Sequence, residues 1–333
     1  MKRRKLLLKL VFLAVILLII FLTFRKSLGD IVFELQSCPL RVLVQICCFS
    51  IIYHLFEGWT TMSLGKRCNP DFKYRWGVFS AFYCSFYRLT TMGTAPGVAA
   101  VVYFEKHDVS YSEGIALYTI QYSIHKVSIA LFALVLFISN WQYMVTRFHS
   151  YIALLFIAFF ITIVICVLVI LLVLSPVFHK KILAFARWLN RRGRFERLVD
   201  RLEAEVSIME GVSRRIIRDA KQVIYLVAVN FVKQFFWFAI PFLILSDGVL
   251  PLSLFQSLSV TSLAVMTAAV IPTPSGIGSL ELIMTGLYSV IAGVDRAGAV
   301  LVLYRIATFF FPFFAGAVLV LLRRAVRKTK IQD

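Results

Sequence analysis

The feature that most constrains this chain is a series of apolar runs, each close to the length of a membrane-spanning helix. A helix needs about 20 apolar residues to cross the hydrocarbon core of a bilayer. The composition agrees, because 60% of the 333 residues are hydrophobic and only 16% are charged, whereas soluble domains are about half apolar and about a quarter charged. The runs cover residues 6–24, 40–60, 77–92, 114–138, 151–174, 223–245, 250–271 and 297–322. We therefore predict an all-α polytopic membrane protein, with residues 1–333 forming a single integral membrane domain.

Two of these runs end at a cluster of proline and glycine and then continue as a shorter apolar piece. The first break, GTAPG, contains Pro96 and Gly97. Proline removes a backbone donor and glycine loosens a helix, and such a break is tolerated at membrane depth only inside protein or beside water. We therefore expect both breaks to line a cavity. The second break, PTPSGIG, contains Pro272, Pro274, Gly276 and Gly278.

The chain can pass each break in two ways. If it enters and leaves the membrane on one side, residues 77–105 and 250–292 form re-entrant helical hairpins and about six full spans remain. Two full spans at a break would also return the chain to its starting side, so the sequence leaves both alternatives open.

The positions of lysine and arginine predict which side of the membrane each segment occupies. With the N-terminus in the cytoplasm, 27 of the 36 Lys and Arg residues fall in cytoplasmic segments, five fall outside and four lie within spans. Cytoplasmic loops carry the excess of basic residues in membrane proteins, so we predict that both termini are cytoplasmic. The net charge of +19 follows from this topology, and we do not expect a nucleic-acid partner.

The two halves of the chain, residues 1–150 and 151–333, repeat the same order of features. Each contains a break, a short helix, a polar turn and a long helix, and the predicted topology makes the two breaks enter the membrane from opposite sides. An inverted repeat with broken helices in matching positions indicates a transport site near the middle of the membrane.

Glu281 and Arg305 are candidates for that site, because ionisable groups within spans are costly and are usually functional. Glu281 begins the short helix after the second break, where the helix dipole favours a carboxylate. It either caps loose backbone amides or faces a cavity. Arg305 has apolar residues on both sides in LVLYRIATFF. We expect it to pair with Glu281, in a structural or a functional role, or to bind a lipid phosphate through its bidentate fork.

Three further cations within spans are candidates for the cavity. Arg88 (SFYRLTTMG) and Lys126 (YSIHKVSIA) lie on either side of the first break, although the long side chain of Lys126 could also reach the membrane surface. Lys233 lies about ten residues into its span, which is deep for such a reach. His54 and Glu57 are one helical turn apart near a span end, and we expect an interfacial pair there rather than a proton relay.

The segment 176–221 is basic and amphipathic. Its apolar residues recur at helical spacing between charged ones, so we predict cytoplasmic helices that lie partly on the anionic membrane surface. An ordinary positively charged cytoplasmic loop would explain the charge but not the spacing. The apolar positions are Phe195, Leu198, Leu202, Val206, Met209 and Ile216.

The sequence contains none of the common catalytic or nucleotide-binding motifs. HExxH, a Walker loop, GxSxG and a dinucleotide fingerprint are all absent from it. The six cysteines are scattered without a CxxC pair, so they do not indicate a metal site. We expect no metal and no cofactor, and we leave an enzymatic activity undecided.

The segment that begins IPTPSGIGSLELIMTGLYSVIAGVDRAG resembles the closing part of the lysylphosphatidylglycerol synthase transmembrane, or flippase-like, family. The shared pattern is a break rich in proline and glycine, a glutamate, a glycine-containing loop, and a helix with arginine and proline. The first break resembles the other hairpin of the family more loosely, since members often have Gly-Gly or Gly-Glu where this chain has APGV. The residues of the shared pattern are Pro272, Pro274, Gly276, Gly278, Glu281, Gly293, Arg305 and Pro312.

This resemblance implies a multi-pass protein of a bacterial or archaeal cytoplasmic membrane. In multiple peptide resistance factors, such a domain is thought to flip aminoacylated phosphatidylglycerol to the outer leaflet, while a separate soluble domain performs the lysyl transfer. This chain ends soon after its last predicted span, at RKTKIQD, so we expect the soluble synthase half to be absent. The family name alone would suggest a phosphatidylglycerol lysyltransferase.

The leading hypothesis is a translocase for anionic or aminoacylated phospholipid, such as (lysyl-)phosphatidylglycerol, that contributes to resistance against cationic antimicrobial peptides. The alternatives are a lipid-modifying membrane transferase, a small-solute transporter, and a non-transporting scaffold that binds lipid and a partner synthase. The scaffold hypothesis predicts that Glu281 and Arg305 can be neutralised together without loss of function. We expect phospholipid, the anionic membrane surface, and a second copy of the chain or a partner synthase as partners.

Overall fold

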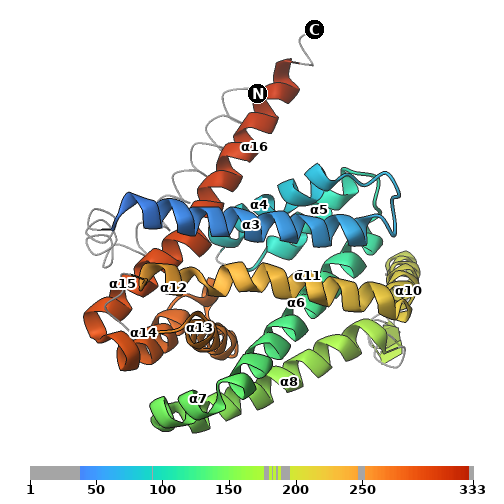
Figure 1. Cartoon of the computed structure of the whole chain (residues 1–333). Helices are drawn as coiled ribbons and strands as arrows, with labels where there is room; N and C mark the ends of the chain where they lie inside the picture. Colours follow the sequence, from blue (N-terminus) through green and yellow to red (C-terminus); the bar gives the residue numbers. More distant parts are fainter. Residues whose placement is uncertain are drawn as a thin grey trace.

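The structure is a computed structural model that describes residues 38–91, 93–175, 180–181, 183–184, 187–188, 196–246 and 252–329. Its regular elements are helices (Figure 1), and no strand occurs among the described residues. This confirms the all-α prediction. The first predicted span, residues 6–24, lies outside the described residues, and so does part of the segment 176–221.

Five segments are long and apolar enough to cross a membrane, and they match the five predicted spans that the described residues contain. The chain is therefore a multi-pass membrane protein. Short elements, α7 (Trp141–Arg147) and η1 (His149–Tyr151), connect the second and third of these spans. The spans are formed by α3 (Leu40–Gly65), α6 (Tyr111–Ser139), α8 (Ile152–Leu174), α11 (Ala220–Phe238) with α12 (Ile240–Ile244), and α15 (Val294–Arg305) with α16 (Phe311–Thr329).

The helices on either side of each break are shorter. They contain 10 to 17 residues and are therefore about 15 to 26 Å long, at about 1.5 Å per residue, whereas the hydrocarbon core is about 30 Å thick. The lengths favour the re-entrant alternative at both breaks, and the order break, short helix, turn, long helix occurs twice. The four helices are α4 (Tyr74–Thr90), α5 (Pro96–Glu105), α13 (Leu254–Ala268) and α14 (Ser279–Ala292).

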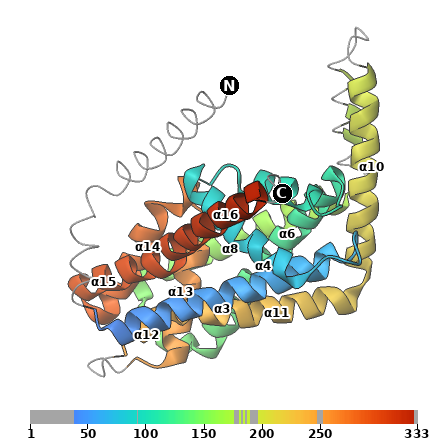
Figure 2. The same ribbon diagram turned by 90° about the horizontal axis from the view of Figure 1, so that it is seen from above.

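Helix α4 is held closely between α3 and α16. A Cβ atom built on Gly77 of α4 would lie 2.1 Å from the carbonyl oxygen of Gly58 in α3. A Cβ atom built on Gly316 of α16 would lie 2.4 Å from the carbonyl oxygen of Phe82 in α4. Small residues let helix backbones approach in this way within membranes. Helix α11 lies along the other side of α3, side by side with it in both views (Figures 1 and 2).

Helix α10 (Glu196–Arg218) stands at one end of the bundle and extends beyond it (Figure 2). Its C-terminal half packs on α6 and α8, where Val212, Ser213 and Ile216 are buried. Met209 and Ile216, two of the six predicted apolar positions, therefore face protein rather than lipid. Contact between the rest of this helix and an anionic membrane surface stays a prediction.

Candidate functional site

The second break carries the ion pair that the sequence predicts. Glu281 lies in the first turn of α14, and Arg305 is the last residue of α15. The Nε atom of Arg305 lies 2.8 Å from Oε1 of Glu281, and its Nη2 atom lies 2.9 Å from Oε2. The contact is therefore bidentate, which is the geometry that a guanidinium and a carboxylate favour. Only 7% of Arg305 is exposed.

Both members of this pair also bind the backbone of the break. Glu281 Oε2 accepts a hydrogen bond of 2.6 Å from the amide of Gly278, and Arg305 Nη2 donates one of 2.6 Å to the carbonyl oxygen of Gly276. The loop between them turns through left-handed backbone at Ser275, where φ is 55°. Glu281 therefore caps the loose amide of Gly278 and pairs with Arg305, and a cavity-facing role for Glu281 stays a prediction.

A wide helical turn follows Arg305. Residues Ile306–Phe310 form a π-helical turn before Pro312, whose nitrogen has no hydrogen to donate. Turns of this kind occur frequently at functional sites. The guanidinium of Arg305 also lies 5.4 Å from the centre of the Phe309 ring, so an aromatic ring packs beside it.

The two breaks touch each other. Ser275 Oγ in the second break donates to the carbonyl oxygen of Arg88 at the end of α4, over 3.1 Å. The amide of Gly93 donates to the same oxygen over 2.7 Å. Pro96 is the first residue of α5, a position where its missing N–H costs nothing, and Gly97 packs on the ring of Tyr118 in α6. The two predicted breaks are therefore in direct contact with each other.

A second buried ion pair lies between α3, α6 and α11. The Nζ atom of Lys233 is 2.5 Å from Oε2 of Glu57 and 3.2 Å from Nδ1 of His125. Gln121 Nε2 donates to the other carboxylate oxygen of Glu57 over 2.7 Å. Lys233 is fully buried and lies near the middle of the span Ala220–Ile244, and the ring of Tyr53 is 5.2 Å from its ammonium.

The predicted pair of His54 and Glu57 is wrong. His54 bonds to the carbonyl oxygen of Ser50 at 2.7 Å and to the hydroxyl of Ser85 at 3.1 Å. Glu57 points instead to Lys233 of α11. The physical reason is that a buried ammonium needs a counter-charge.

Arg88 and Lys126 lie around this second centre. The charge of Arg88 acts on both Lys126 and Lys233, and Lys233 contacts the carboxylate of Glu57. Arg88 is exposed at the last turn of α4, whereas Lys126 is half-buried with its ammonium 5.4 Å from the ring of Tyr122. The centre therefore carries an excess of positive charge.

The chain matches the family described as Lysylphosphatidylglycerol synthase TM region over residues 6–316. It belongs to this family. No curated protein matches the sequence. As a member of the family, the chain is related to the synthesis or flipping of lysylphosphatidylglycerol, and phospholipid is the class of molecule that the family name connects with it.

In this member of the family, sequence reasoning missed a set of buried hydroxyl groups on α13. Tyr288 of α14 shares its hydroxyl with Ser257, at 3.1 Å, and with Thr261, at 2.7 Å. Asn140 donates to the hydroxyl of Ser259 over 2.9 Å. The signal was present, because LFQSLSVTSLAVMTA places Ser257 and Thr261 four residues apart, on one face of a helix.

Proposed function

We propose that this chain moves anionic or aminoacylated phospholipid, such as (lysyl-)phosphatidylglycerol, from one leaflet of the membrane to the other. The headgroup would pass through the protein while the acyl chains stay in lipid. Membership of the family supports phospholipid as the substrate class. In a bacterial or archaeal cytoplasmic membrane, with both termini in the cytoplasm, this activity would contribute to resistance against cationic antimicrobial peptides.

The observation that carries the proposal is the excess of cations at the second centre. Lys233 contacts Glu57, and the charge of Arg88 acts on both Lys233 and Lys126. Uncompensated charge within a membrane is costly, and a phosphate would supply the missing negative charge. Within the described part of the chain, Arg88 forms no ion pair, and a guanidinium binds phosphate through two parallel hydrogen bonds.

The joined breaks support a path for the headgroup beside this centre. Arg88 belongs to both regions, since its backbone carbonyl contacts Ser275 of the second break while its charge acts on Lys233. We infer that the headgroup is held first by Arg88 and Lys233, and that it moves as the contact between the breaks opens. Glu281 and Arg305 keep the second break in shape during this movement.

Leaflet exchange in liposomes tests the proposal directly. Liposomes containing the purified chain would carry fluorescent phosphatidylglycerol, its lysyl form or phosphatidylcholine, and a quencher added outside would report movement between leaflets. We expect the protein to move both phosphatidylglycerol lipids faster than protein-free liposomes do. Arg88→Gln should slow this movement at least about tenfold, which corresponds to about 1.4 kcal/mol. Arg41→Gln, at the far end of α3, is the matched control and should have no effect.

A rate equal to that of protein-free liposomes, both with and without an imposed proton gradient, would contradict the proposal. The proposal would also be contradicted if all three lipids moved at the same rate and Arg88→Gln did not change that rate. The cations would then have no part in selecting the lipid. If the protein did not accelerate lipid movement but bound a partner synthase, the scaffold hypothesis would gain support.

A further inference from the structure

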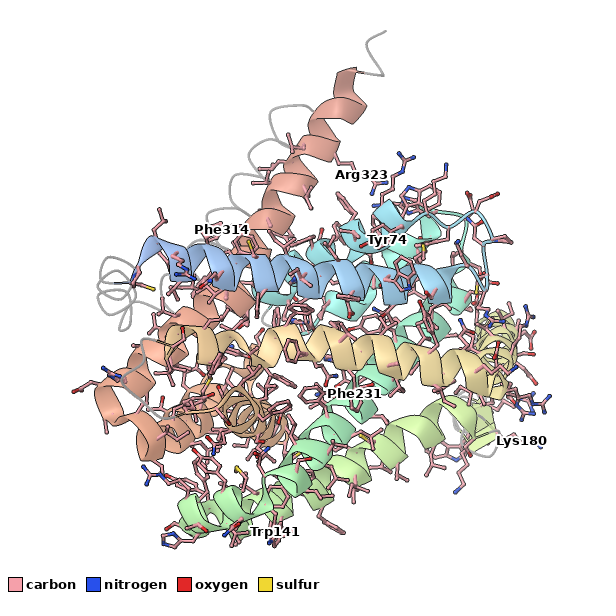
Figure 3. The ribbon with its side chains drawn as sticks, in the orientation of Figure 1. Tyr74, Trp141, Lys180, Phe231, Phe314 and Arg323 are labelled. Carbon is pink, nitrogen blue, oxygen red and sulfur yellow. The ribbon has the colours of Figure 1, made fainter. Side chains whose placement is uncertain are left out.

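An apolar groove lies between α3, α4 and α16, and its lining includes no member of either ion pair. It has a volume of about 310 Å³. Leu55 comes from α3 and Leu319 from α16, and α4 supplies the rest of the lining. Figure 3 shows Tyr74 and Arg323 on the side of the bundle where α16 passes α4. The lining residues are Leu55, Tyr74, Arg75, Val78, Phe79 and Leu319.

The predicted topology places the ends of α3 and α4 that border the groove at the cytoplasmic surface of the membrane. The shallow end of the groove is marked by Trp59, which donates a hydrogen bond to Tyr225 and lies 5.7 Å from the ring of Tyr74. Tryptophan and tyrosine gather at the level of lipid headgroups. Val78 lies one helical turn deeper along α4 than Tyr74, and Leu55 lies one turn deeper along α3 than Trp59. The groove is therefore polar at the headgroup level and apolar below it.

Two guanidinium groups flank the shallow end. Arg75 lines the groove itself, and Arg323 follows Leu319 by one turn of α16, with its guanidinium 4.9 Å from the centre of the Phe79 ring. Arg75 lies one helical turn before Phe79 on α4, and the guanidinium of Arg323 also lies 5.2 Å from the centre of the Tyr103 ring. Within the described residues, neither arginine forms an ion pair with a carboxylate, and both side chains are exposed.

His107, in the turn after α5, holds Arg323 in this place. Its Nδ1 atom donates to the carbonyl oxygen of Tyr103 over 2.8 Å, so Nε2 can accept from Arg323 Nη2 at 3.3 Å. Burial lowers the pKa of His107, and the positive charge of Arg323 lowers it further. The neutral ring that this arrangement needs is therefore favoured, and His107 acts as a positioning residue for Arg323.

We propose that this groove binds an anionic phospholipid, with the phosphate between Arg75 and Arg323 and one acyl chain along Leu55, Val78 and Leu319. The charges are complementary, because two guanidinium groups without carboxylate partners meet a phosphate diester. The apolar lining matches the acyl chain. We assign the groove as the site where lipid enters the translocase, and this role rests on the proposed function. Binding itself does not depend on movement between leaflets.

Lipid binding to the full chain in detergent tests the site. Phosphatidylglycerol or phosphatidylcholine with one brominated acyl chain would be titrated into the protein, and quenching of tryptophan fluorescence would report occupation of the groove. Wild type should bind phosphatidylglycerol at least about tenfold more tightly than phosphatidylcholine. Arg75→Ala with Arg323→Ala should abolish this preference by weakening only phosphatidylglycerol. Arg41→Ala, an exposed arginine at the other end of α3, should leave both affinities unchanged.

Two further variants separate lost binding from lost folding. Leu319→Trp fills the groove but keeps both guanidinium groups, so it should weaken both lipids by the same factor. Arg75→Lys with Arg323→Lys keeps the charges without the forked geometry, and should give an intermediate affinity. Circular dichroism and size-exclusion chromatography would show that each variant is folded.

Equal affinity of wild type for the two lipids would overturn the site, and so would unchanged phosphatidylglycerol binding in the double alanine variant. Competition by glycerol phosphate as strong as that by phosphatidylglycerol would also overturn it, because the arginines would then form a site for free phosphate. Selective binding without leaflet exchange would refute the proposed function and leave the site standing. Leaflet exchange without selective binding would support the proposed function and refute the site.

Discussion

The two buried ion pairs of this chain differ in what else they hold. Arg305 and Glu281 both bond to the backbone of the second break, one to a carbonyl and the other to an amide. Lys233 and Glu57 lie on continuous helices, and their other hydrogen bonds go to a histidine and a glutamine side chain. One pair therefore holds a loop in shape, whereas the other holds only side chains.

This difference separates a positioning role from a binding role. If a ligand displaced Arg305 from Glu281, the break would lose partners for its backbone groups, and unpaired backbone groups are costly in a membrane. If a phosphate displaced Glu57 from Lys233, the helices would keep all their backbone hydrogen bonds. We therefore assign exchange with a lipid headgroup to Lys233, and support of the break to Arg305.

Lys233→Met should have the largest effect on stability. It leaves the carboxylate of Glu57 without its cation in a site where 23% of that side chain is exposed, and losing one partner of a buried pair costs about 3–5 kcal/mol. Adding Glu57→Leu should recover most of the free energy of unfolding in mixed micelles, because no backbone group is left unpaired. Lipid movement should stay lost in both variants. Wild-type movement in the double variant would remove Lys233 from the proposed site.

Arg305→Met with Glu281→Leu sharpens the comparison, because here the double variant should not recover. The part-buried carbonyl of Gly276 and the exposed amide of Gly278 would both lose their side-chain partners, and an unsatisfied buried group costs about 1–3 kcal/mol. We expect the free energy of unfolding to stay about 1–3 kcal/mol below wild type. A double variant as stable as wild type would show that Arg305 and Glu281, like Lys233 and Glu57, are not needed to hold the backbone of the break.

Local sequence patterns predicted one of these pairs and not the other. The spans, the breaks and the pairing of Glu281 with Arg305 follow from apolar length, from proline and glycine, and from charges placed close to a break. These signals are carried by neighbouring residues. The contact between a carboxylate after the break and an arginine on the next helix needed no knowledge of how distant helices pack.

Glu57 and Lys233 are 176 residues apart, and no local pattern joins them. The apolar residues of α3 do not gather on one face, so their periodicity does not indicate which face meets α11. The contact of Ser275 with the backbone of Arg88 is hidden for the same reason, since it depends on how the two breaks meet. Rotation and approach of helices in a membrane are decided by packing of small and polar side chains.

Gly93→Ala tests whether the two breaks must touch. The residue has a φ of +85°, and an added Cβ would lie 2.9 Å from the amide nitrogen of Ser275. Gly276→Ala is the matched control, because its φ of +70° imposes similar strain while nothing lies within 4 Å. We expect Gly93→Ala to lower the free energy of unfolding by about 1–3 kcal/mol more than the control does. Equal losses would mean that the contact between the breaks adds no stability.

Arg88→Gln and Lys126→Gln compare two cations of the same centre that differ in exposure. Arg88 is exposed and Lys126 is half-buried against Tyr122, so Arg88→Gln should alter the free energy of unfolding by less than about 0.5 kcal/mol. Movement of phosphatidylglycerol should fall more in Arg88→Gln, since its guanidinium also offers the forked geometry. A larger loss in Lys126→Gln would shift the headgroup site toward α6.

An ion pair at the membrane surface should give the smallest effect. Asp219, just before α11, accepts a hydrogen bond of 3.1 Å from the amide of Gln222 and pairs with Arg67. Both bonds lower the pKa of Asp219 below its ordinary value of 3.8. A carboxyl with a lowered pKa stabilises the fold above its ordinary value, and that contribution is lost as the pH falls through the pKa of the folded state.

Asp219→Asn isolates the charge, because asparagine caps helices as well as aspartate does. The melting temperature of wild type should exceed that of the variant at pH 7, and the difference should shrink as the pH falls below 3.8. Differential scanning fluorimetry of both proteins between about pH 7 and about pH 3 would measure it. Because both side chains are about one-third exposed, solvent screens the pair, and the difference should be smaller than for either buried pair. Parallel curves over the whole range would show that the link between Asp219 and Arg67 contributes no charge-dependent stability.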